Sequence, residues 1–170
     1  KGALILTERT LKDAESGLDL ATLTSTTFAR GNGGYDGPSD EAPRPHKVPE
    51  REPDFAVDLT TLDMAALIYR LSGDYNPLHA SPSVAKAAGF PKPILHGLCS
   101  LGVAGHAILK GCCDYDAKRL KSLQLRFSSP VYPGETVRTE IWRDGANISF
   151  KSKIVERDVV VLDNGHATVE

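Results

Sequence analysis

The sequence lacks any apolar run of about 18 residues, the length that a membrane-spanning helix needs. It also lacks clustered Lys and Arg, and its net charge of −2 at pH 7 excludes a globally basic nucleic-acid-binding protein. Cysteine is scarce: the three cysteines, two of them adjacent, are a poor disulfide framework and favour a reducing compartment. No Cys-x-x-Cys pair occurs and the five histidines show no short metal-ligand spacing, so we expect neither a metal site nor a cofactor.

We expect no sorting signal within this sequence. The short apolar run near the first residue is not followed by a signal-peptidase site, and the last three residues do not form a Ser-Lys-Leu address. The composition is ordinary for a globular protein, with 41% hydrophobic and 25% charged residues. A length of 170 residues leaves room for one domain, or for one domain and part of another.

Residues 1 to 30 have the pattern of a β-hairpin, with a polar turn at residues 12 to 17. Two strands alone are marginal in water, and no helix of their own covers them. We therefore expect the hairpin to belong to a sheet whose other strands are absent, and the sequence to be a fragment of a longer polypeptide. Residues 31 to 54 hold four glycines and five prolines, so a linker is expected there. Its glycine cluster at residues 30 to 35 either cradles a phosphate or is a plain connector.

Two short helices and one long helix are predicted next. Residues 62 to 69 have helical spacing, with Thr60 or Thr61 as N-cap and Gly73 at the end. The second helix has an N-cap, a first-turn proline and a terminal glycine, at Ser81, Pro82 and Gly89.

The long helix, residues 97 to 110, is apolar on nearly every side, which predicts burial. Small residues at 102, 104 and 105 would let a sheet approach it closely. A free Cys on such a helix is usually core, so Cys99 is interpreted as packing rather than as a nucleophile. His106 is likewise interpreted as a core histidine with its hydrogen bonds satisfied.

Strands are predicted at about residues 119 to 128, 136 to 143, 147 to 156 and 159 to 169, with turn residues between them. Helices come first and strands follow as a meander, without alternating βαβ units. This order predicts an α+β fold, in which an antiparallel sheet folds around one buried helix.

The loop between the two short helices holds the best candidates for chemistry. Asp74, Asn76 and His79 stand at i, i+2 and i+5, with Pro77 restricting the backbone. A carboxylate and an imidazole on one rigid turn can both reach a water molecule, and Asn76 can position a reactant. The alternative is an Asp cap followed by a surface histidine. The density of polar groups in an otherwise apolar region favours the catalytic interpretation.

Gly97 stands at the mouth of the long helix, where the first N–H groups have no intrahelical partner. Without a side chain, Gly97 would let a thioester oxygen approach its N–H closely, as in an oxyanion hole. The alternative is a plain glycine at a helix start.

Several motifs together resemble one known family. Residues 69 to 79, Tyr-Arg-Leu-Ser-Gly-Asp-Tyr-Asn-Pro-Leu-His, and Ala-Ala-Gly-Phe at 87 to 90 closely resemble the motif of MaoC-like, (R)-specific enoyl-CoA hydratases. The likeness continues through Pro-Ile-Leu-His-Gly-Leu at 93 to 98 and Arg126-Phe127 to residues 130 to 134. It covers about residues 54 to 170 and is similar in detail to the hydratase 2 domains of eukaryotic peroxisomal multifunctional enzymes.

The resemblance implies a hot dog fold, a long helix wrapped by an antiparallel sheet, within a double hot dog. Residues 1 to 30 would be the last strands of a truncated N-terminal repeat, 31 to 54 a linker, and 55 to 170 the catalytic domain. By the same resemblance the site residues are the catalytic Asp74 and His79, the assisting Asn76, the oxyanion donor Gly97, and the substrate-binding Lys1, Tyr75, Pro77, Leu78 and Phe127.

The activity implied is hydration of trans-2-enoyl-CoA to (3R)-3-hydroxyacyl-CoA in fatty acid β-oxidation, in the peroxisome. CoA belongs to the substrate, and no separate cofactor is needed. A homodimer and fusion to other β-oxidation domains are expected. The rival interpretations are a non-catalytic acyl-CoA-binding or dimerisation module and an acyl-CoA thioesterase. A thioesterase would normally carry a carboxylate on the central helix, and residues 97 to 110 contain none.

Overall fold

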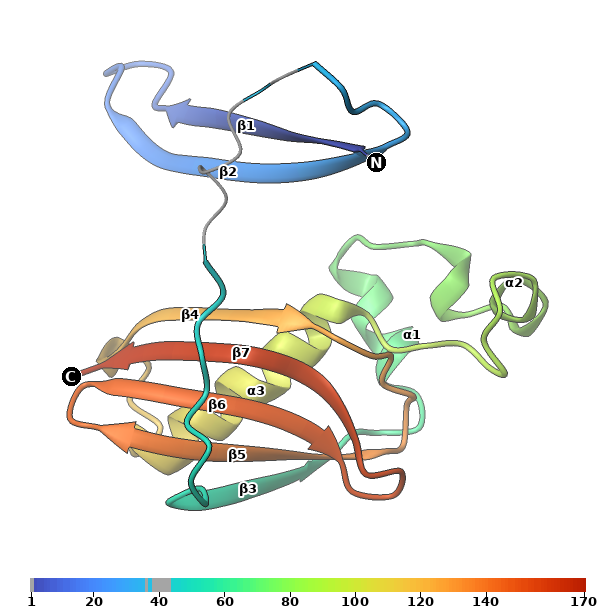
Figure 1. The fold of residues 1–170 in the computed structure, drawn as a ribbon, viewed down its shortest axis with the longest axis vertical. Helices are drawn as coiled ribbons and strands as arrows, with labels where there is room; N and C mark the ends of the chain where they lie inside the picture. Colours follow the sequence, from blue (N-terminus) through green and yellow to red (C-terminus); the bar gives the residue numbers. More distant parts are fainter. Residues whose placement is uncertain (1, 36, 38–43) are drawn as a thin grey trace. The chain divides into compact units, whose positions relative to one another are not determined.

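The computed structural model describes residues 2–35, 37 and 44–170 (Figure 1). Contacts divide the chain into two units, Lys1–Arg44 and Pro45–Glu170. The first unit holds the predicted hairpin, in which β1 (Gly2–Lys12) pairs antiparallel with β2 (Asp19–Arg30). Asp13 shapes its turn, because its carboxylate accepts the N–H groups of Glu15 and Ser16 at 3.1 and 2.6 Å.

The hairpin exposes its apolar side chains. Most of its leucines, with Ile5 and Phe28, are about half exposed or more within the described residues. Burying such side chains would be favourable by roughly 1.5–3 kcal/mol each. A two-stranded ribbon has no layer of its own to bury them against, as the sequence analysis anticipated.

The second unit is built on a five-stranded antiparallel sheet in the order β3-β5-β6-β7-β4. The strands are β3 (Phe55–Thr60), β4 (Leu120–Phe127), β5 (Thr136–Asp144), β6 (Asn147–Ile154) and β7 (Val159–Val169). The long helix α3 (Gly97–Cys112) crosses one face of this sheet (Figure 1). The predicted α+β architecture, with an antiparallel sheet around a long helix, is confirmed.

The core lies between α3 and the sheet. Alternate residues of the central strands point inward, and Ile148, Phe150 and Ile154 of β6 are fully buried. They meet the small and apolar side of α3, where Ala104 and Ile108 are also fully buried. Every second residue of β6 is buried, and these residues pack against one side of the helix. A single core between a sheet and a helix requires this pattern.

Residues 45–54 cross the opposite face of the sheet (Figure 1). Hydrogen bonds to the sheet hold this segment; for example, the Trp142 indole N–H donates to the Arg51 carbonyl at 2.8 Å, and the Asn164 amide donates to the His46 carbonyl at 2.7 Å. This part of the predicted linker is therefore packed on the sheet.

Between β3 and α3 the chain forms a set of short helices at one end of the sheet. They are α1 (Ala65–Tyr69), the 3-10 turns η1 (Arg70–Ser72) and η2 (Pro77–His79), and α2 (Pro82–Ala87). A last 3-10 turn, η3 (Ala117–Arg119), leads into β4. This set of turns carries the candidate site.

The expected start of the first helix was wrong, and the strand before it was not predicted. No local pattern predicted β3, and Thr60 or Thr61 was the expected N-cap of the first helix, whereas the N-cap is Met64. Thr60 belongs to β3 and pairs with Thr136, and the Thr61 hydroxyl donates to the Glu135 carbonyl at 3.0 Å. Pairing with β5 therefore takes these threonines before the helix begins.

The expectation that α3 is buried all round was also wrong for this chain. Leu98, Gly102 and His106 follow one another at helical spacing and are exposed, because the described sheet covers only the other side. His106 is thus not a core histidine, and its Nε2 lies 3.3 Å from the Tyr115 hydroxyl. The sheet approaches α3 closely at Gly105, where an added Cβ would lie 3.3 Å from Leu123. It does not approach α3 closely at Gly102.

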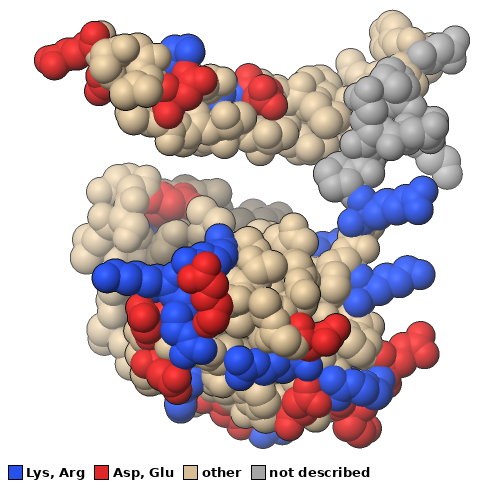
Figure 2. All heavy atoms as spheres, turned by 90° about the vertical axis from the view of Figure 1, so that its left-hand side faces the viewer, with Lys and Arg blue, Asp and Glu red and all other residues tan. Residues whose placement is uncertain are grey.

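Charges of both signs are interspersed on the face of the second unit that Figure 2 shows. Ion pairs also join neighbouring strands of the sheet, such as Arg138 with Asp58 at 2.6 Å and Lys153 with Glu140 at 3.2 Å. Among the described residues, no helix has the length and apolar character needed to cross a membrane.

Candidate active site

The loop from Gly73 to His79 is shaped by its own side chains. Gly73 ends η1 with φ of 108°, a left-handed conformation that glycine adopts without strain. The Asp74 carboxylate accepts the Asn76 N–H at 3.2 Å, and the Asn76 side-chain oxygen accepts the Leu78 N–H at 3.0 Å. Pro77 opens η2, as its fixed φ favours. Two overlapping turns of this kind place Asp74 and His79 at defined positions.

His79 is 8% exposed, and one of its ring nitrogens is already engaged. Its Nδ1 lies 2.8 Å from the Ile94 carbonyl oxygen. A carbonyl can only accept, so in the neutral ring Nδ1 carries the hydrogen and Nε2 carries the lone pair. The fold therefore presents Nε2 as a base.

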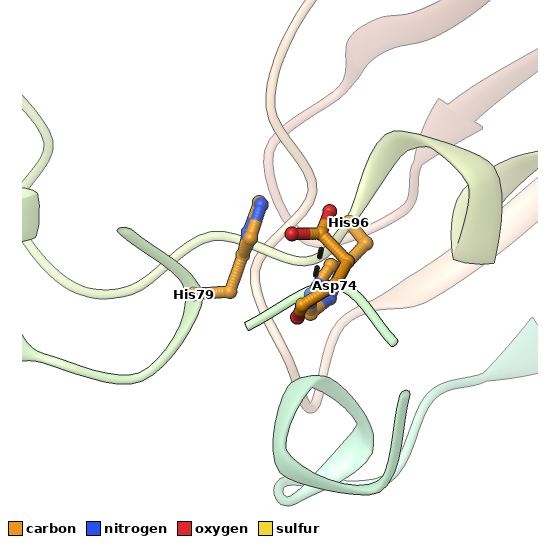
Figure 3. A group of neighbouring side chains, drawn as sticks. All are labelled: Asp74, His79 and His96. Carbon is orange, nitrogen blue, oxygen red and sulfur yellow. Dashed lines mark hydrogen bonds and ion pairs between the residues drawn. The ribbon is translucent and has the colours of Figure 1, made fainter. Parts of the chain in front are cut away.

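A third titratable side chain, which the sequence analysis did not single out, completes the cluster. His96 is 1% exposed, and its Nε2 lies 3.2 Å from the Asp74 carbonyl oxygen and 3.9 Å from the Asp74 carboxylate. Its ring stacks on that of His79, with centroids 3.7 Å apart (Figure 3). Burial lowers the pKa of His96 below its ordinary value, so the ring is neutral at neutral pH.

Gly97, directly after His96, is the first residue of α3. The His96 side chain makes no capping hydrogen bond, and no acceptor for the Gly97 N–H is found among the described residues. An unpaired N–H at a helix N-terminus favours a partner with negative charge. The ring of Phe127, at the end of β4, lies 3.4 Å from where a Cβ on Gly97 would stand.

Two pockets adjoin at Gly97 and Phe127, which line both. One, of about 320 Å³, is lined by His79 and by apolar residues that include Phe90, Ile94 and Val131. The other, of about 530 Å³, is lined by Asp74 and His96 together with Tyr69, Ser72 and Gly73. The catalytic candidates thus line two adjoining pockets, with His79 in one and Asp74 in the other, as a substrate with two distinct ends would require.

The family follows from a comparison of sequences. The profile described as MaoC like domain matches residues 45–165. The chain belongs to the MaoC-like domain family.

Two named relatives match most of the chain. It is 45% identical over 144 residues to mouse peroxisomal multifunctional enzyme type 2, which covers 83% of this chain and 20% of the mouse protein. It is 41% identical to the peroxisomal enoyl-CoA hydratase 2 of Arabidopsis thaliana, over 95% of this chain and 55% of that protein. The chain thus spans about half or less of each of these two relatives.

A solved MaoC-like dehydratase from Phytophthora capsici has the same fold. It is 43% identical, with a TM-score of 0.88, and the match covers 100% of this chain and 60% of that one. The hot dog architecture expected from the sequence motifs is therefore that of this chain.

In this MaoC-like domain the fold brings together four of the predicted site residues, Asp74, His79, Gly97 and Phe127.

The other predicted site residues lie elsewhere or are engaged differently. The side-chain oxygen of Asn76 already accepts the Leu78 N–H within the turn. Three predicted substrate contacts belong to the same loop but line neither of the two pockets: Tyr75, Pro77 and Leu78. Tyr75 is exposed, with the Arg70 guanidinium 5.6 Å from its ring centroid. Lys1 lies outside the described residues.

Asp74, His79 and His96 also offer potential metal-ligand atoms within 4.8 Å of one another. Structural zinc takes four ligands in a tetrahedron and catalytic zinc takes three around one point. Two stacked imidazoles direct their in-plane nitrogens nearly parallel rather than toward a common point. One nitrogen of each ring already faces a main-chain carbonyl. This arrangement suits hydrogen bonds to a small molecule better than it suits coordination.

Proposed function

We propose that this chain carries the active site of an (R)-specific 2-enoyl-CoA hydratase, which adds water to trans-2-enoyl-CoA to give (3R)-3-hydroxyacyl-CoA. The observation that carries the proposal is the meeting of the Asp74–His79 pair with the unpaired N–H of Gly97 at the mouth of α3. The name enoyl-CoA hydratase 2 of the Arabidopsis relative supports the same reaction class.

The pair can hold the reacting water. A carboxylate oxygen of Asp74 and a ring nitrogen of His79 lie within 4.8 Å of each other, a separation that one water can bridge with bonds of about 2.8 Å. His79 Nε2 has the lone pair to accept a proton, and the half-exposed Asp74 carboxylate can orient the water and share the proton.

The addition balances within the substrate and this pair. The water oxygen bonds to C3, and the electrons of the C2–C3 double bond move toward the thioester oxygen. The proton lost by water passes to the Asp74–His79 pair, which returns a proton to C2. Negative charge develops on the thioester oxygen, and the Gly97 N–H, at the positive end of α3, is placed to stabilise it. No electron is gained or lost overall, so the proposal needs no cofactor.

The proposal extends to the larger protein. The exposed apolar faces of β1 and β2 support the view that residues 1 to 30 are the end of an N-terminal repeat in a double hot dog. The multifunctional mouse relative supports fusion to other β-oxidation domains, and the peroxisomal names of both relatives support that location. A homodimer and acyl-CoA recognition by Tyr75 and its neighbours are part of the same proposal.

The test is hydration of trans-2-decenoyl-CoA, followed as loss of the enoyl thioester absorbance, with the product resolved by chirality. Asp74→Asn keeps an acceptor for the Asn76 N–H but removes the charge. His79→Asn keeps a donor for the Ile94 carbonyl but removes Nε2. Each is expected to lower kcat by about 10²–10⁴-fold, the usual contribution of a general acid or base.

Asp116→Asn is the matched control, because the Asp116 carboxylate also accepts a main-chain N–H two residues on, but outside the site. It should leave kcat unchanged. Binding of substrate without turnover by the wild-type chain would contradict the proposal and favour a binding module. Release of free CoA would favour a thioesterase.

A further inference from the structure

We propose that His96 is a positioning residue, which holds the Asp74 loop and the His79 ring in the arrangement that hydration requires. This inference rests on the proposed function for its catalytic meaning, but its geometry stands on the residues themselves. His96 contacts both members of the pair and immediately precedes Gly97, so one side chain links the acid, the base and the oxyanion donor.

The first contact orients Asp74. Since the Asp74 carbonyl can only accept, His96 Nε2 carries the hydrogen and donates to it at 3.2 Å. The same nitrogen is 3.9 Å from the Asp74 carboxylate. Asp74 and His96 are 22 residues apart, so this hydrogen bond attaches the loop to the start of α3. Without it, only local turn contacts would hold the carboxylate beside the pockets.

The second contact orients His79. The two rings stack with a 26° angle between their planes, while the Ile94 carbonyl holds the Nδ1 edge of His79. A stacked face and one bonded edge together determine the direction of Nε2. The stack also places a ring under His79 where that residue becomes positively charged on accepting a proton. A neutral aromatic face attracts such a cation, whereas a charged ring would repel it.

The surroundings of His96 keep it in the neutral form. It is packed under Tyr69, with ring centroids 4.7 Å apart, and the charged or titratable groups around it are Asp74, His79 and Arg70. Its Nδ1 is buried and has no hydrogen-bond partner in the part of the chain that the structure describes. An unpaired buried nitrogen is unfavourable, and an apolar side chain kept only for packing would avoid this cost. The geometry therefore favours a role toward the pair over a role in the core.

Two substitutions separate the two contacts. His96→Gln keeps a donor near the position of Nε2 but loses the ring, whereas His96→Phe keeps the ring but loses the donor. Misplacement of a catalytic group by about 1 Å can reduce the rate by about 10²-fold. We expect His96→Phe to lower kcat by about that factor with KM little changed, and His96→Gln to retain more activity. His166→Gln, on a strand away from the pockets, is the matched control and should behave as wild type.

Nitrogen NMR of the histidine rings decides the geometry independently of activity. In the wild-type chain His96 should be the Nε2–H tautomer, and its pKa should lie below that of an ordinary histidine because the ring is buried. His79 should be the Nδ1–H tautomer, and it should lose this single state in His96→Gln.

A wild-type His96 that titrates at or above the pKa of an ordinary histidine, or that carries its hydrogen on Nδ1, would overturn the proposal, and so would folded variants with wild-type kcat. If the wild-type chain hydrates nothing, the proposed function fails, while the NMR spectra still decide whether His96 holds the pair.

Discussion

Gly97→Ala tests two properties of the N-terminus of α3 separately. The first is whether the packing there tolerates a side chain, and the second is whether a substrate oxygen can reach the Gly97 N–H. A methyl group at this position would lie 3.4 to 3.6 Å from the ring of Phe127, which is ordinary van der Waals contact. Gly97 is exposed and needs no positive φ. We therefore expect the free energy of unfolding to stay within about 0.5 kcal/mol of wild type.

The same methyl group should impair catalysis. In an α-helix the Cα–Cβ bond tilts toward the N-terminus, the direction in which the unpaired N–H of Gly97 also points. The methyl group would thus stand where the thioester oxygen has to approach. Removing one oxyanion donor lowers kcat by about 10²–10³-fold, or about 2.7–4 kcal/mol. We expect a loss of about 10²-fold in kcat/KM.

Two assays measure the two effects. Hydration of trans-2-decenoyl-CoA gives kcat/KM, and urea unfolding followed by the fluorescence of Trp142, the single tryptophan, gives the stability of the second unit. Gly165→Ala is the converse control, because its Cβ would run into the main-chain oxygen of Phe150 on the paired strand. It should lose about 1–3 kcal/mol or more of stability and keep its activity per folded molecule. Wild-type kcat/KM in Gly97→Ala would refute the oxyanion role, and loss of folding there would refute the packing argument.

Two further predictions concern stability. Phe150→Ala removes a fully buried ring from the core and should lower the free energy of unfolding by about 3–5 kcal/mol. In urea this loss should appear as a lower midpoint of unfolding at an unchanged slope. A loss below about 1 kcal/mol would contradict the described packing of Phe150. Hydrogen bonds from the Arg51 guanidinium and the Arg143 N–H lower the pKa of Asp54 from 3.8 to about 2. The Asp54 carboxylate therefore stabilises the fold above pH 3.8, and this contribution is lost as the pH falls through 2. Asp54→Asn should therefore show a smaller drop in melting temperature between pH 4 and pH 2, and parallel curves for variant and wild type would rule this out.

Local patterns predicted the parts of the molecule that depend on neighbours in sequence. In β6 the buried residues alternate strictly, and the predicted and observed strands begin at the same residue, 147. The Asp74–His79 loop was also predictable, because Gly73, Asp74, Asn76 and Pro77 shape it through turns a few residues long. Gly97 was predictable in the same way, because the residues before and after it in the sequence indicate that a helix starts there.

Other features depended on residues far away in the sequence. β3 is a strand because it pairs with β5, about 80 residues later, and that pairing also removed Thr60 from the helix it was expected to cap. His106 was expected in a core, yet the sheet covers only one side of α3 in this chain.

His96 was not recognised as a site residue, since its hydrogen bond to Asp74 and its stack on His79 exist only once the loop packs against α3. The residue types and short spacings of the sequence thus determined which groups are available for chemistry. Only tertiary packing decided which of them meet, because contacts between distant segments follow from burial and strand pairing across the whole fold rather than from any local pattern.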